Sequence, residues 1–135
     1  MSAEPRPRLV VITDDDRQFV ELLTALLSAV PHLRVVGRAA NGEEAVTLTE
    51  TLHPDVVLMD LDMPVVDGFE ATARIRELAP DTCVVIISAH EDPARIRAAE
   101  EAGAAGFVAK SDVPTELAER VVSICDQHDL LRNVA

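Results

Sequence analysis

The sequence alternates short apolar runs with longer amphipathic segments, and this alternation restricts the fold more than any other feature. Short apolar runs rich in valine and isoleucine predict strands, and the intervening segments repeat their apolar residues at helical spacing. The predicted strands cover residues 9–12, 33–39, 55–60, 83–87 and 105–109. Strands that alternate with helices predict a parallel sheet with right-handed crossovers. We therefore expect an α/β fold, a single doubly wound domain with a five-stranded parallel sheet and five helices.

Several helices carry start and stop signals. Asn41, with Glu44 three residues later, predicts a capped helix start. Asp67 before Gly68 predicts a turn and another cap, and Pro31 ends the first helix. The last helix opens at Val113-Pro114. Its predicted core face is Leu117, Val121, Ile124 and His128, beside a second apolar stripe of Ala118, Val122 and Cys125. That stripe fits either a broadly buried helix or a homodimer or output interface.

Length and charge limit the function classes. A chain of 135 residues with 48% hydrophobic content predicts one domain, over residues 8–126. Residues 1–7 read as a polar lead-in without a signal peptide, and residues 127–135 as a C-terminal extension or the start of a linker. The net charge of −12 disfavours direct binding to nucleic acid or anionic membranes and favours a cation or a basic protein surface. We expect a cytoplasmic protein with both cysteines, Cys83 and Cys125, reduced.

Polar side chains follow four of the five predicted strands. Asp14 and Asp15 follow the first strand, Asp60 the third, Ser88 the fourth and Lys110 the fifth. Because the carboxyl ends of parallel strands face one crevice, we expect these side chains to converge there. Each has a structural explanation when taken alone, such as helix capping, a loop start, a core serine or a surface lysine. Their joint occurrence at the strand ends favours a functional site.

Clustered carboxylates need a cation or must hold a proton. Two unit charges about 5 Å apart repel by roughly 3 kcal/mol at an effective dielectric near 20. An all-oxygen site suits Mg²⁺. The sequence has no cluster of Cys or His residues of the kind that would indicate a zinc site. Lys110 is the only lysine among 12 basic residues, and its compact charge suits a single carboxylate or phosphate oxygen. The set is typical of a phosphoryl-transfer site.

The combination resembles the receiver domains of two-component response regulators. The resemblance covers about residues 8–126, nearly the whole chain. It rests on Asp14-Asp15, the strand before Asp60, Met63-Pro64, Asp67-Gly68, Ser88-Ala89 and Phe107 three residues before Lys110. The segment 103–111 is most similar to receivers that precede a helix-turn-helix output domain. The resemblance implies the flavodoxin-like strand order 2-1-3-4-5.

The resemblance also implies roles for the residues of the crevice. Asp60 would be the phosphoacceptor, taking a phosphoryl group from a phosphohistidine on a histidine kinase or phosphotransfer protein. Asp15 and Asp60 would ligate Mg²⁺ directly, with Mn²⁺ as a substitute. Asp14 would act through water and Asp62 through its main-chain carbonyl. Lys110 would pair with Asp60 and later with the acyl phosphate.

Other positions would switch the domain or tune it. Ser88 would donate a hydrogen bond to the phosphoryl group, and Phe107 would follow into the vacated space. That movement would remodel the face of the fourth helix, fifth strand and fifth helix for partner binding or dimerisation. Asp62 and His90 occupy positions that tune hydrolysis. The sequence departs from the family where Ser88 replaces the commoner threonine and Ser111 replaces proline.

Three other classes remain open. Asp60-Leu-Asp62 also resembles the nucleophile motif of haloacid-dehalogenase-type Mg²⁺-dependent phosphatases, but Met63-Pro64 replaces the expected tail and no cap domain is expected. A flavodoxin-like cofactor binder would need a Ser/Thr/Gly-rich phosphate loop where Asp14–Asp16 stands. A phosphorylation-independent interaction module shares the architecture. We expect no enzyme beyond a domain that catalyses its own phosphoryl transfer and slow autodephosphorylation.

Overall fold

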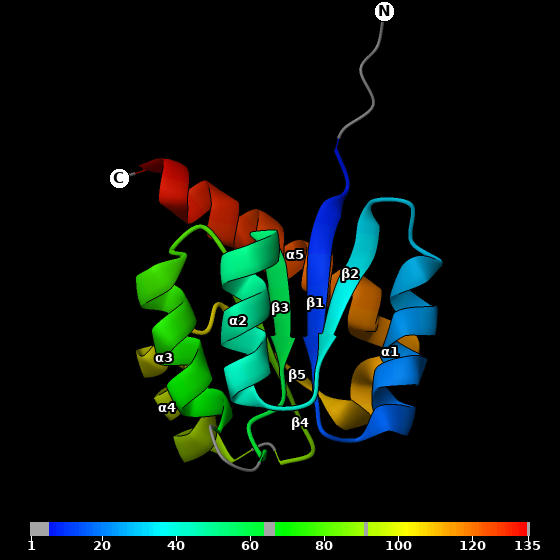
Figure 1. Cartoon of the computed structure of the whole chain (residues 1–135), viewed down its shortest axis with the longest axis horizontal. Coiled ribbons are helices and arrows are strands. Elements are labelled where there is room, and N and C mark those ends of the chain that lie inside the picture. Colours follow the sequence, from blue (N-terminus) through cyan, green and yellow to red (C-terminus); the bar gives the residue numbers. More distant parts are fainter. Residues whose placement is uncertain (1–5, 64–66, 91, 135) are drawn as a thin grey trace, which may run out of the picture.

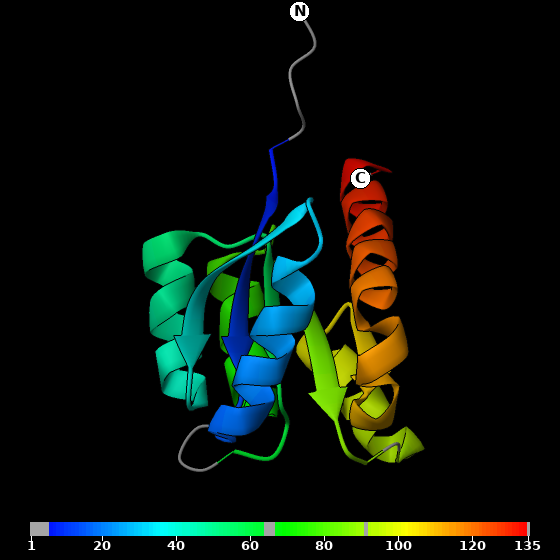
Figure 2. The same ribbon diagram turned by 90° about the vertical axis from the view of Figure 1, so that its right-hand side faces the viewer.

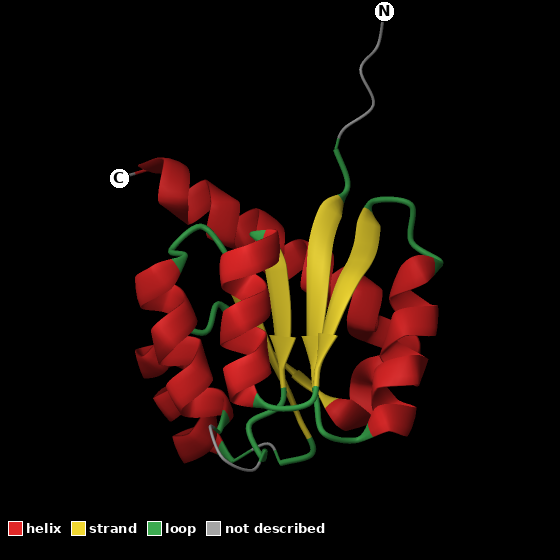
Figure 3. Cartoon of the chain, viewed as in Figure 1, coloured by secondary structure: helices red, strands yellow, loops and turns green. Residues whose placement is uncertain are grey.

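The computed structural model describes residues 6–63, 67–90 and 92–134, and its centre is a parallel sheet in the order β2-β1-β3-β4-β5 (Figures 1 and 3). The predicted fold class and strand order are thus confirmed. The elements are β1 Arg8–Thr13, α1 Arg17–Ser28, β2 Leu33–Ala39, α2 Gly42–Leu52, β3 Val56–Met59, α3 Gly68–Leu78, β4 Cys83–Ser88, α4 Pro93–Ala102, β5 Gly106–Ala109, a 3-10 turn Lys110–Asp112 and α5 Val113–Val134.

Helices cover both faces of the sheet (Figures 1 and 2). On one face, α1 and α5 pack over a core that includes Leu23, Leu27, Leu117 and Val121. On the other face, α2, α3 and α4 pack over a second core that includes Ala45, Ala71, Ile75 and Ala99. Every residue of β3 and β4 is buried, which explains why these strands read as continuous apolar runs without polar alternation.

The predicted helix caps are present. Asn41 Oδ1 accepts a hydrogen bond from the Glu44 N–H at 2.9 Å, and Asp67 Oδ1 accepts one from the Glu70 N–H at 2.9 Å. Glu44 reaches back to the N–H of Ala40, one residue before the cap. These contacts satisfy N–H groups that a helix start leaves without intrahelical partners, and they fix where α2 and α3 begin.

One prediction about the helices needs correction, and one open alternative is decided. The first helix ends at Ser28 rather than at Pro31, since the last residues before the proline form a turn in which the Val30 N–H bonds to Leu27 O. At Cys125, the second apolar stripe of α5 follows the broadly buried alternative rather than the interface alternative. Cys125 is 1% exposed and faces the sheet, four residues after Val121 and on the same face of α5. Among the described helices, none has the length and apolar character needed to cross a membrane.

Candidate functional site

Three aspartates meet at the carboxyl edge of the sheet. Asp14 and Asp15 follow β1 and Asp60 follows β3, and one carboxylate oxygen from each lies within 4.8 Å of the others. Asp14 is 3% exposed and Asp60 is 5% exposed, whereas Asp15 is open to solvent. The third acidic residue after β1, Asp16, instead caps α1 by accepting from the N–H groups of Gln18 and Phe19. The predicted convergence of three carboxylates is therefore confirmed.

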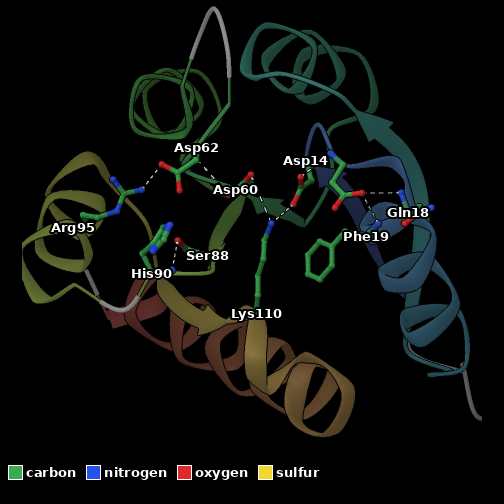
Figure 4. Close-up of polar contacts among 10 residues, drawn as sticks. Asp14, Gln18, Phe19, Asp60, Asp62, Ser88, His90, Arg95 and Lys110 are labelled. Atoms are coloured by element: carbon green, nitrogen blue, oxygen red, sulfur yellow. Dashed lines mark hydrogen bonds and ion pairs between the residues drawn. The ribbon is translucent and has the colours of Figure 1, made fainter.

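Lys110 places its ammonium among these carboxylates (Figure 4). Its Nζ lies 2.8 Å from Asp14 Oδ2 and 3.9 Å from Asp60 Oδ2, so the expected partner, Asp60, is the more distant one. Asp14 and Asp60 are both buried, so a cation close to either carboxylate offsets the cost of removing its charge from water. The Nζ also lies 4.4 Å from the centre of the Phe19 ring, a favourable position over an aromatic face.

The environment shifts the ionisation of two groups. Burial, and next the negative charge of Asp14, raise the pKa of Asp60 to about 6, although the charge of Lys110 and the N–H of Asp62 act in the opposite direction. That N–H lies 3.3 Å from Asp60 Oδ1. Burial lowers the pKa of Lys110, but its hydrogen bond to Asp14 and the charge of Asp60 outweigh burial and raise the pKa overall. The ionised form of Asp60 is therefore destabilised by burial and by Asp14, and the ammonium of Lys110 offsets part of that cost.

A glycine at the start of α3 fits closely against the backbone of Asp60. The Gly68 N–H donates to Leu61 O at 3.2 Å. A Cβ on Gly68 would lie 2.3 Å from Asp60 O and 2.7 Å from Leu61 Cα, and both of these are backbone atoms that cannot turn aside. The Asp67-Gly68 pair predicted as a turn therefore also sets how closely α3 approaches the end of β3.

Ser88 and Phe107 lie on one face of the sheet, on adjacent strands. Ser88 is completely buried, and its Oγ accepts from the His90 N–H at 3.2 Å. Phe107 is the register partner of Ile86, two residues before Ser88, so both side chains point toward the α3–α4 side. The guanidinium of Arg120 on α5 donates to Phe107 O at 2.6 Å, which ties the strand of Phe107 to the last helix.

Asp62 turns away from the carboxylate cluster. Its Oδ1 accepts from Arg95 Nη2 at 2.7 Å, and the Arg95 guanidinium lies 5.5 Å from the Phe69 ring centre (Figure 4). Of the predicted loop motif Met63-Pro64, Met63 is buried and Pro64 lies outside the described residues. Sequence reasoning missed Arg95 and placed Phe19 only in the core, because neither contact leaves a periodic or spacing signal.

Comparison with known proteins identifies the class that this fold and site define. Residues 10–122 match the family model described as "Response regulator receiver domain". The chain is 36% identical over 128 residues to the probable transcriptional regulatory protein NarL of Mycobacterium tuberculosis, covering 95% of this chain and 59% of NarL. The chain therefore belongs to the receiver domains of two-component response regulators, the signalling domains of phosphorelay systems.

Solved structures agree with this assignment. The receiver domain of the putative response regulator NarL from Mycobacterium tuberculosis superposes with a TM-score of 0.86 at 37% identity, over 90% of this chain and 98% of that one. One chain of the CheX-CheY-BeF3-Mg²⁺ complex from Borrelia burgdorferi gives a TM-score of 0.81 at 30% identity, over 88% of this chain and 90% of that one. The chain spans little more than half the length of the NarL regulator, so it corresponds to one part of that protein.

Proposed function

We propose that Asp60 is the phosphoacceptor of this receiver. The observation that carries the proposal is the placement of a nearly buried carboxylate, raised in pKa, between two other carboxylates and one ammonium. A carboxylate oxygen of Asp60 attacks the phosphorus of a phosphohistidine on a histidine kinase or phosphotransfer protein. The P–N bond breaks, the imidazole nitrogen keeps the electron pair and takes up a proton, and Asp60 becomes an acyl phosphate.

The donor set of the crevice fits a magnesium ion. Asp14, Asp15 and Asp60 offer hard carboxylate oxygens from two strand ends, and the exposed side of Asp15 leaves room for water and phosphoryl oxygens. When bound, Mg²⁺ would neutralise the phosphoryl oxygens, and Mn²⁺ would serve as a substitute. The Asp62 main-chain carbonyl is a further candidate ligand. The related CheX-CheY complex was determined with Mg²⁺ and BeF3 together, which supports the same chemistry here.

Ser88 and Phe107 would convert phosphorylation into a change of surface. The Ser88 hydroxyl now accepts from the His90 N–H, and it would turn to donate to a phosphoryl oxygen. Phe107, on the same face of the adjacent strand, would follow and remodel the surface of α4, β5 and α5. His90 and Asp62, two residues beyond Ser88 and Asp60, would tune hydrolysis. The partner would be a protein in the cytoplasm, either an output element or a second copy of this chain through α5.

Two rival functions predict different chemistry. A dehalogenase-type phosphatase would turn over p-nitrophenyl phosphate, and an interaction module would not accept a phosphoryl group at all. We expect that acetyl phosphate with Mg²⁺ adds one phosphoryl group per chain, seen by intact mass, and that chelation of Mg²⁺ prevents it. We expect no turnover of p-nitrophenyl phosphate. A chain that stays unlabelled, or one that hydrolyses this ester catalytically, would overturn the proposal.

A further inference from the structure

An ion pair at the mouth of the crevice connects α4 to the loop after β3. The carboxylate of Asp62 and the guanidinium of Arg95 are 2.7 Å apart, with side chains 51% and 29% exposed. The Phe69 ring on α3 lies beside the same guanidinium, 5.5 Å from its carbon. Three separate elements therefore hold this pair, which distinguishes it from a surface salt bridge between two free side chains.

The pair controls where a negative charge points. Asp62 is two residues from Asp60, and its main-chain N–H is bonded to the Asp60 carboxylate. Its side chain points toward α4 and Arg95, whereas the Asp60 carboxylate points toward Lys110 (Figure 4). A free Asp62 carboxylate would add repulsion at the place where an anionic phosphoryl group must enter.

We propose that Arg95 is a positioning residue for phosphoryl transfer, which neutralises Asp62 and holds its carboxylate on the α4 side of the entrance. The inference rests on Asp60 being the phosphoacceptor. Arg95 does not contact Asp60 in this arrangement. It acts through Asp62, because the net charge of the Asp62–Arg95 pair is zero.

The two single variants should change the phosphorylation rate in opposite directions, because they remove opposite charges. Arg95→Ala leaves one negative charge beside the acceptor, so phosphorylation by the acetyl phosphate anion becomes slower. Asp62→Asn leaves one positive charge there, so phosphorylation becomes faster. Each change is roughly threefold, the effect of one unit charge about 8 Å away in a mostly aqueous environment. Asp62→Asn placed in the Arg95→Ala background recovers the loss, and Arg95→Lys keeps the charge and most of the rate.

The experiment measures the rate of acetyl phosphate labelling by intact mass, at saturating Mg²⁺ and at two ionic strengths. Arg97→Ala removes an exposed arginine from the same helix and is the matched control, with an expected rate equal to wild type. Added salt should shrink the differences among the variants, because screening shortens the reach of a single charge. A loss caused by a disturbed fold would be insensitive to salt.

The outcomes separate this inference from the proposed function. If wild type takes up no phosphoryl group, the phosphoacceptor assignment fails and this inference fails with it. If wild type is labelled but Arg95→Ala is labelled equally fast, only the role of Arg95 is overturned. It is also overturned if both single variants slow the reaction, since opposite charges must act in opposite directions.

Discussion

The ammonium of Lys110 donates a hydrogen bond to Asp14 Oδ2 at 2.8 Å, so the cation after β5 is held by the carboxylate after β1. These two strands are not neighbours, because β3 and β4 lie between them in the sheet. The pair therefore spans the crevice above Asp60. Any divalent cation that uses Asp14 must compete with Lys110 for the same carboxylate.

Removing this ammonium should strengthen metal binding. We expect Lys110→Ala to bind Mg²⁺ several-fold more tightly than wild type, since one positive charge about 5 Å from the ion is lost and Asp14 is freed. Calorimetric titration with MgCl₂ measures the affinity. Arg34→Ala removes the same charge from the exposed start of β2, at the opposite end of the sheet, and should leave the affinity unchanged. Equal or weaker Mg²⁺ binding by Lys110→Ala would contradict the competition.

The raised pKa of Asp60 predicts a stability cost at neutral pH. The carboxyl titrates near 4 in the unfolded chain and at about 6 in the folded one, so its contribution to stability is fully present below pH 4 and is lost as the pH rises through 6. We expect Asp60→Asn to unfold with a free energy about 1–3 kcal/mol higher than wild type at pH 7.5 without Mg²⁺. The difference should disappear near pH 4. Urea unfolding at several pH values measures it, and a variant less stable than wild type at pH 7.5 would refute the pKa shift.

Because Gly68 lies so close to the backbone of Asp60, adding one methyl group at position 68 should lower both the stability of the protein and its rate of phosphorylation. Gly68→Ala places a Cβ 2.3 Å from the Asp60 carbonyl oxygen, so the backbone must shift. We expect a loss of roughly 1–3 kcal/mol in unfolding free energy together with slower phosphorylation. Gly37→Ala is the control, because its Cβ meets mainly the movable Leu52 side chain, at 3.1 Å, far from the acceptor. Similar effects of the two substitutions on phosphorylation would argue against a backbone constraint at Asp60.

The strands and most helix starts could be predicted because their causes are local. An apolar run between polar residues predicts a buried strand, and a capping side chain bonds only three residues ahead, as Asp67 does to Glu70. Strand ends then predict which side chains share the crevice, since parallel strands align their carboxyl ends. For this reason Asp14, Asp15 and Asp60 were found from the sequence.

Contacts between distant elements were not predictable in the same way. The preference of Lys110 for Asp14 over Asp60 is a difference of about one ångström, which depends on the detailed geometry of the loops after the strands. The pairing of Arg95 with Asp62 depends on how α4 packs beside the loop after β3, and a single arginine in a helix gives no spacing signal. The sequence left two alternatives open for Cys125 because two apolar stripes lie side by side on α5 and periodicity alone does not rank them.

The two cysteines should be unreactive until the chain unfolds. Cys83 at the start of β4 and Cys125 on α5 are each 1% exposed. The neighbouring thiol of Cys125, together with burial, raises the pKa of Cys83 above the usual range of a thiol. Because the thiolate is the reactive form, we expect aromatic disulfide reagents to modify neither thiol in native conditions and both in urea. Rapid modification of the native protein would contradict this packing.

Two aspartates flank β3, and they provide the most direct test of the central claim. Asp60 lies in the crevice, whereas Asp55 lies at the other end of the strand and accepts a hydrogen bond from the Leu9 N–H. We compare wild type, Asp60→Asn and Asp55→Asn by intact mass after incubation with acetyl phosphate and Mg²⁺. Wild type and Asp55→Asn should each gain one phosphoryl group, and Asp60→Asn should gain none. A phosphoryl group that persists on folded Asp60→Asn would contradict the assignment of Asp60 as the acceptor.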